Sequence, residues 1–169
     1  ARKCSLGGAA AWASACVAVA SGDRVMIRVL AGAGLGPPPG FVVGRHRVVE
    51  LAERLQNVKP SGRTDFASEM ARYLAGLRRA GKVFVISDFL MLLNSITRGL
   101  GLFTAASMDL TAVQILGGRE INGQGLDGDV EIVDSESGER LRVSIAERER
   151  NQYRKTMPRL THATKCFCF

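Results

Sequence analysis

Lys82-Val83-Phe84-Val85-Ile86-Ser87-Asp88-Phe89 is the stretch that decides the fold, because an uninterrupted apolar run ends in a carboxylate. A strand of Val, Phe and Ile without polar alternation is typical of a strand that is buried on both faces, as in the parallel sheet of an α/β protein. The run therefore predicts a parallel strand with Asp88 at its carboxyl end. In open α/β sheets, that edge is where ligands and ions bind.

A second polar turn, Ser61-Gly62-Arg63-Thr64-Asp65, stands upstream at the start of a helical pattern. Thr64 and Asp88, on neighbouring loops, could hold a hard cation through oxygen. A plainer interpretation stays open, because Thr, Asp and Ser side chains also cap helices. Thr64 or Asp65 would then cap the helix that follows it, and Asp88 would cap the next one.

Four short motifs stand along the chain, each of them once. They are Gly22-Asp23-Arg24-Val25, Gly62-Arg63-Thr64-Asp65, Ile86-Ser87-Asp88-Phe89 and Asp134-Ser135-Glu136-Ser137-Gly138-Glu139-Arg140-Leu141. In order and spacing they resemble a bacterial family of unknown function that has a von Willebrand factor A-like domain and is typically encoded beside MoxR-type AAA+ ATPases. The resemblance runs from about Gly22 to Tyr153.

The resemblance implies a metal-ion-dependent adhesion site. Such a site has an Asp-x-Ser-x-Ser loop after the first strand, a Thr on a second loop and an Asp that ends a later strand. Thr64 and Asp88 are similar to the second and third parts, and Asp65 would stand behind them as a supporting residue. The first part is absent, so we expect a fragment, incomplete at both ends, that lacks the first strand and its loop. The implied cofactor is Mg²⁺ or Mn²⁺ in the intact parent protein and none in this chain.

Alternating helical and strand patterns predict an α/β fold. The resemblance makes it a von Willebrand A-like, Rossmann-type fold: a mostly parallel sheet with helices on both faces, plus a β-hairpin near the C-terminus. It also places the missing first strand between two strands of this chain, over 24–30 and 82–88. We expect one truncated domain over 1–169, with the family match over about 22–153. The expected helices cover 5–21, 46–57, 66–79 and 90–103, with a polar helix from about 146 that breaks near Pro158; the other expected strands cover 41–43, 109–116, 130–134 and 140–145.

Composition fits one globular domain, with 46% hydrophobic and 23% charged residues. The net charge is +7, from 23 Lys and Arg against 16 Asp and Glu, which raises the alternative of a basic nucleic-acid-binding module. The basic residues are scattered and are not interleaved with aromatic residues, so we expect a solvated surface and no nucleic acid. Apart from the N-terminal segment around Cys16, no stretch approaches the ~20 apolar residues of a membrane span. We expect a cytoplasmic protein, whose parent could be tethered to a membrane outside this segment.

The resemblance implies a protein-interaction domain that works with a MoxR-type ATPase in the assembly or maturation of a protein complex. The alternative from another class is a metal-dependent enzyme that acts on phosphate esters, because Mg²⁺ held by carboxylates also serves phosphoryl chemistry. Ser87 lacks the flanking glycines of the nucleophile elbow found in serine hydrolases. His46 and His162 have no partner at the spacing of a catalytic triad or of a metal site. Because the sequence offers no convincing set of catalytic residues, we favour the protein-interaction domain over the enzyme.

Overall fold

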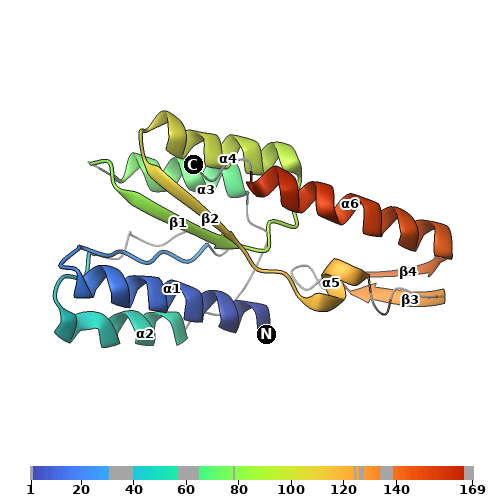
Figure 1. The fold of residues 1–169 in the computed structure, drawn as a ribbon, viewed down its shortest axis with the longest axis horizontal. Coiled ribbons are helices and arrows are strands. Elements are labelled where there is room, and N and C mark those ends of the chain that lie inside the picture. The colour runs from blue at the N-terminus through green and yellow to red at the C-terminus, as the bar shows by residue number, and fades with distance from the viewer. Residues whose placement is uncertain are drawn as a thin grey trace.

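The computed structural model describes residues 2–30, 40–56, 65–77, 79–123, 125, 128–133 and 139–165, with side chains for all of these except 2–4, 119 and 159–165. The described chain is a mixed α/β structure (Figure 1). Its helices are α1 (Arg2–Ala20), the 3-10 turn η1 (Arg45–Arg47), α2 (Val48–Gln56), α3 (Phe66–Ala75), α4 (Leu93–Ala105), α5 (Gly118–Asn122) and α6 (Glu147–Lys165). Its strands are β1 (Lys82–Ser87), β2 (Asp109–Gln114), β3 (Gly128–Val133) and β4 (Arg140–Ile145).

The predicted parallel strand is confirmed as β1. It pairs with β2 in parallel register from Lys82 opposite Asp109 to Ser87 opposite Gln114. Helices α3 and α4 lie on one side of this pair, and α1 and α2 lie on the other (Figure 1). A hydrophobic cluster joins the pair to α3 and α4; its buried members are Phe66, Met70, Val83, Val85, Phe89, Ile96, Leu100, Phe103 and Leu110.

Helices α3 and α4 pack closely because Gly99 has no side chain. A Cβ at Gly99 would lie 2.5 Å from Phe66 Cε1 and 2.6 Å from its Cδ1. The Phe66 ring is almost fully buried and cannot swing into solvent. Glycine is unfavourable inside a helix, so its presence here is explained by this contact.

A second, smaller cluster lies on the α1 side of the molecule. Ala15, Val42 and Leu51 are its buried members, with Val25 and Ile27 packed against them. The prediction of a sheet strand over 24–30 is wrong. Apart from one antiparallel bridge, in which Val25 and Val42 exchange hydrogen bonds of 2.9 and 2.7 Å, no ladder forms along this segment in the described part of the chain. A segment that is extended but has no neighbouring strand along most of its length cannot form a sheet.

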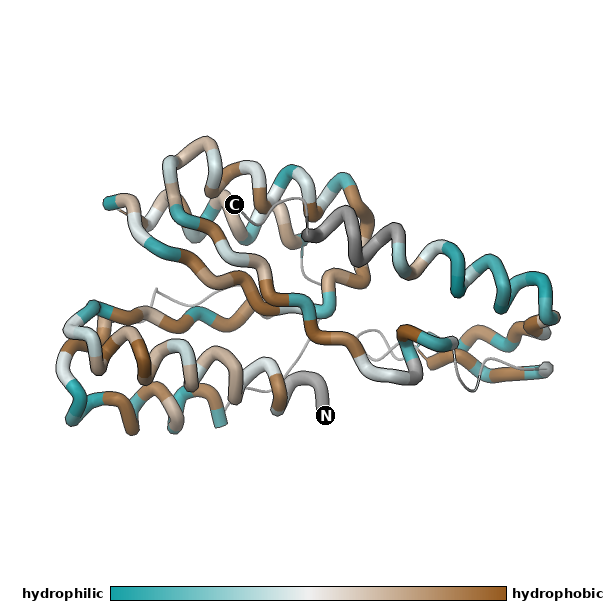
Figure 2. The backbone as a smooth tube through the Cα atoms, in the orientation of Figure 1, coloured by the Kyte–Doolittle hydropathy of each residue, from teal (hydrophilic) through white to brown (hydrophobic). Residues whose placement is uncertain are grey.

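The predicted C-terminal hairpin is confirmed as the antiparallel pair β3–β4, whereas the Ser135–Gly138 turn lies outside the described residues. The predicted break near Pro158 is wrong, because α6 continues to Lys165 with Pro158 inside it. Proline removes one backbone donor and bends a helix without having to end it. The tube in Figure 2 is coloured mostly as hydrophilic along the described residues of α6. None of the helices in the described ranges is long and apolar enough to cross a membrane.

Several helix ends differ from the predicted ones. Helix α3 stops at Ala75, where Gly76 follows as the C-cap, and α4 starts at Leu93, after a turn that the periodicity could not distinguish from a helix. The expected helix over 46–57 begins as a 3-10 turn. The five-residue helix α5 was not expected, because five residues are too few for an apolar stripe to be visible.

One edge of β1 has no strand beside it in the part of the chain that the structure describes. Asp109 N–H donates to Gly81 O, and Ile115 N–H donates to Ser87 O, so the odd-numbered residues of β1 face β2. In a parallel ladder the intervening residues point their N–H and C=O groups the opposite way. The backbone groups of Lys82, Phe84 and Ile86 therefore lie along the outer edge, and such an edge is a template for pairing with another chain.

The Gly99 contact gives a first prediction. Gly99→Ala should destabilise the fold by about 1–3 kcal/mol through overpacking against Phe66, although helix propensity alone predicts a gain of about 1 kcal/mol. Gly101→Ala is the matched control, because a Cβ at Gly101 meets nothing within 4 Å, and it should stabilise. Denaturant unfolding of both variants measures the difference. If the two alanines shift the free energy of unfolding alike, the close contact does not control α3–α4 packing.

The outer edge of β1 gives a second prediction. Phe84 is 45% exposed, and Phe84→Lys should raise the temperature at which the heated chain begins to scatter light, because a charge on an open edge opposes strand pairing. Leu92, in the turn before α4, is 81% exposed, and Leu92→Lys removes an apolar group elsewhere. Equal effects of both variants would mean that general surface hydrophobicity, and not the β1 edge, drives association.

Candidate functional site

Asp88 lies at the carboxyl end of β1, as predicted, in a turn that is closed by hydrogen bonds. Phe89 N–H donates to Ser87 Oγ at 3.1 Å, and Leu90 N–H donates to Asp88 Oδ1 at 3.2 Å. Gln114 Nε2 donates to the Asp88 backbone oxygen at 2.9 Å. Side chains of β1 and β2 thus hold the backbone around Asp88 from both strands.

The same turn contains a strained residue. Phe89 has a φ of 52°, in the left-handed region that bulky side chains rarely adopt. Its ring is fully buried and packs edge-to-face on Phe66, with ring centroids 6.1 Å apart and planes at 83°. Burial of the ring offsets the backbone strain and ties the turn to the core. Strain of this kind concentrates at functional sites, so the turn is a candidate site.

Asp65 is the N-cap of α3, as the capping interpretation expects. Its carboxylate accepts hydrogen bonds from Ser68 Oγ at 2.7 Å and from Ser68 N–H at 3.3 Å. The side-chain bond from Ser68, followed by the backbone bond, holds the pKa of the Asp65 carboxyl below its usual value. The cap therefore contributes fully above the ordinary carboxyl pKa, and its contribution is lost as pH falls through the lowered one.

Asp88 does not cap α4. The N-cap position of that helix is Leu92, which makes no side-chain capping bond, and Asp88 instead closes the turn at Leu90. Thr64 lies outside the described residues, so its position relative to Asp88 is not described.

A hard cation needs several oxygen ligands that converge on one point. Within the residues that the structure describes, no group of three or more His, Cys, Asp or Glu side chains converges. The Asp65 carboxylate is engaged as a helix cap, and Asp88 is the one carboxylate in the 87–90 turn. Mg²⁺ requires six ligands in near-octahedral geometry. These residues alone do not make a metal site.

The sequence alone does not identify two residues that shape this turn, Phe89 within it and Gln114 at the end of β2. Gln114 was overlooked because it lies in a strand, yet strands that run in parallel end at the same edge, so the last residue of β2 is a neighbour of Asp88. Phe89 is part of one of the four motifs, and its burial in the core is not expected from that motif. Its position could have predicted the burial, because an aromatic residue directly after a buried strand can turn back into the core.

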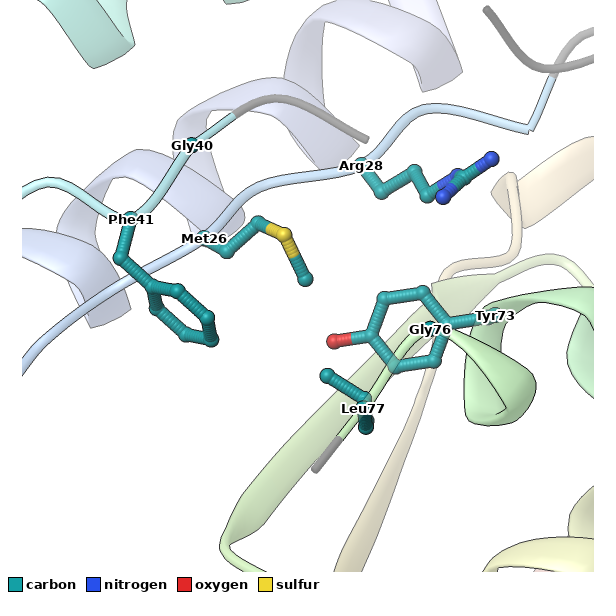
Figure 3. A pocket seen from close by; sticks show the side chains of 7 residues that line it. All are labelled: Met26, Arg28, Gly40, Phe41, Tyr73, Gly76 and Leu77. Atoms are coloured by element: carbon teal, nitrogen blue, oxygen red, sulfur yellow. The ribbon is translucent and has the colours of Figure 1, made fainter. Parts of the chain in front are cut away.

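A separate pocket opens between the extended segment after α1 and the end of α3 (Figure 3). It has a volume of about 180 Å³ and is lined by Met26, Arg28, Gly40, Phe41, Tyr73, Gly76 and Leu77. The Tyr73 hydroxyl points into the space between Met26 and Leu77 (Figure 3). Burial raises the pKa of the Tyr73 phenol, so it stays protonated and able to donate at neutral pH. A cavity of roughly 150 Å³ holds a benzene ring, so this pocket has room for one large apolar side chain.

Comparison with protein families gives a match. The family model described as "Protein of unknown function DUF58" matches residues 1–163. The comparisons with curated proteins and with solved structures gave no match. Since the matched range spans nearly all of the 169 residues, the chain belongs to the DUF58 family.

Proposed function

We propose that this chain is a protein-interaction domain of the von Willebrand A type, which works in the cytoplasm with a MoxR-type AAA+ ATPase in the assembly or maturation of a protein complex. The observation that carries the proposal is the turn at the carboxyl end of β1. There, a strained backbone and hydrogen bonds from two strands fix Asp88 at the edge of a parallel pair. Carboxyl edges of this kind are where α/β folds bind their ligands.

The arrangement of the strands supports the von Willebrand A-type order. In that order a strand lies between the segment over 24–30 and β1. The outer edge of β1 carries backbone groups that point away from β2, and the pocket at Tyr73 separates the extended segment from the end of α3. A strand between these elements would satisfy the β1 edge and could place one apolar side chain in the pocket.

For metal binding we propose Thr64 and Asp88 as two ligands of Mg²⁺ or Mn²⁺, with Asp65 behind them and the other ligands supplied from outside the described residues. Asp65 suits a supporting position because its carboxylate is already engaged by Ser68. When bound, such an ion offers a positive charge with an open position for an acidic side chain of the partner. This chemistry breaks no bond in the partner, which agrees with a binding function.

Isothermal calorimetry tests the metal proposal on the chain itself. We expect no tight binding of Mg²⁺ or Mn²⁺, because the described donors at this edge leave most of an octahedral shell to water. Micromolar affinity that disappears in Asp88→Ala would show that this chain holds a complete site, against the ligand set proposed above.

The role of Asp88 is tested by a change that keeps its hydrogen bond. In the intact parent protein, Asp88→Asn retains an oxygen that can accept from Leu90 N–H, so the melting temperature should stay near that of the wild type. Capture of the MoxR-type ATPase by the same variant should fall at least about tenfold, roughly 1.4 kcal/mol of binding. Asp109→Asn is the matched control, because Asp109 is paired with Lys82 at the opposite end of the strands.

A core variant completes the comparison. Ile96→Ala should destabilise the fold by about 2–5 kcal/mol, because Ile96 is fully buried, yet it should still capture the ATPase below its melting temperature. If Asp88→Asn captures the ATPase as well as Asp109→Asn does, Asp88 only shapes the turn and the adhesion-type proposal is wrong.

A further inference from the structure

One peptide bond in the 87–90 turn is held at both of its polar groups by side chains. The oxygen of the peptide between Asp88 and Phe89 accepts a hydrogen bond from Gln114 Nε2 at 2.9 Å. The N–H of the same peptide donates to Ser87 Oγ at 3.1 Å. Both bonds are partly buried, where hydrogen bonds are stronger than in open water. Side chains from β1 and β2 thus fix the direction in which this one peptide points.

The direction of this peptide is also the cause of the strain at Phe89. The φ of Phe89, 52°, is the rotation about the bond that follows the peptide. A half-turn of the peptide plane would take this angle to roughly −128°, inside the broad β region that is open to every residue. Such a half-turn moves only the atoms between the two Cα atoms. The buried Phe89 ring would therefore keep its edge-to-face contact with Phe66.

The other non-glycine residue with a positive φ in the described ranges is Ser107, at 54°, and it has an ordinary cause. It directly follows the end of α4. Ser107 N–H donates to Thr104 O at 3.0 Å, and Met108 N–H donates to Phe103 O at the same distance. These bonds close a helix end in the common left-handed form. Phe89 follows a strand and closes no helix, so its positive φ depends on the two side-chain bonds.

Gln114 and Ser87 are able to bond to this peptide in either direction. A side-chain amide carries both a donor and an acceptor, and so does a hydroxyl. After a half-turn, Gln114 Oε1 can accept from Phe89 N–H, and the Ser87 hydroxyl can donate to Asp88 O. The strained direction is nevertheless the one observed, so the bonds made in this direction outweigh the strain. The peptide therefore has two hydrogen-bonded states, one strained and one relaxed.

We propose that the peptide between Asp88 and Phe89 is a two-state switch at the carboxyl edge of β1, held in its strained state by Gln114 and Ser87. In the strained state, the Asp88 carbonyl oxygen points toward Gln114 on β2. In the relaxed state it points the opposite way, where it can accept a hydrogen bond from a bound protein. A protein that donates to this oxygen shifts the population toward the relaxed state. The switch does not depend on which protein binds at this edge.

Nuclear magnetic resonance of the chain tests the proposal, because the three-bond coupling between the amide and α protons depends on φ. The coupling of Phe89 is larger in the relaxed state than in the strained one. Gln114→Lys keeps a donor and loses the acceptor, so Phe89 should stay strained. Gln114→Glu keeps an acceptor and loses the donor. The ratio of relaxed to strained chains should then rise about tenfold, as expected when one hydrogen bond is lost.

Gln114→Met separates the hydrogen bond from the introduced charges. It has a similar length but no charge and no strong donor, so the strain should shift Phe89 toward the relaxed state. The coupling of Ser107 is the internal control and should be the same in every variant, and melting curves check that the fold is retained. The proposal is overturned if Phe89 has the same coupling in Gln114→Lys and Gln114→Glu, or if Gln114→Met leaves it at the wild-type value.

Discussion

The packing of Phe66 against the bare backbone of Gly99 is the contact on which the rest of the structure depends. It sets the distance between α3 and α4, and these two helices cover one side of the β1–β2 pair. The same ring receives the edge of Phe89, whose backbone is strained. Phe66 therefore connects the hydrophobic core directly to the turn that carries Asp88. A change that loosens the α3–α4 contact is expected to reach the candidate site through this one side chain.

The elements that could be predicted are those with an uninterrupted apolar run or a clear alternation. The apolar run over 82–87 predicts a strand, which forms as β1 although Phe84 is exposed and one edge is open, and the alternation over 140–145 fits a hairpin. The segment over 24–30 has an equally strong strand composition, but strand formation needs a partner, and composition says nothing about whether one is present. Helix ends were less predictable because they depend on single caps. Gly76 ends α3 one turn before the periodicity fades, and the strained turn at Phe89 delays the start of α4.

The candidate site was predictable in its position and not in its chemistry. A carboxylate after a buried strand has to lie at the carboxyl edge of the sheet, and Asp88 does. Whether such a carboxylate holds a metal, caps a helix or closes a turn depends on neighbours that are distant in sequence, such as Gln114, 26 residues further along. The role of Asp65 is determined by a residue nearby in the sequence, because Ser68 stands three residues away and can form the capping hydrogen bond. The sequence therefore resolves the role of Asp65 better than that of Asp88.

Helix α1 exposes large apolar residues as well as burying apolar ones. An amphipathic helix turns its large apolar groups toward the core, whereas α1 buries Ala15 and Val19 and also leaves Leu6, Trp12 and Val17 outside. On the inward side, a Cβ at Gly7 would lie 3.7 Å from Ile115 Cδ1 and 3.8 Å from Ile86 Cγ2, which is ordinary packing distance. On the outer side, polar residues would fit equally well and would lower the cost of exposure to water. The large outward residues contribute nothing to either hydrophobic cluster of the described chain. Packing within the described chain therefore explains the buried side of α1 and not the large apolar residues on its outer side.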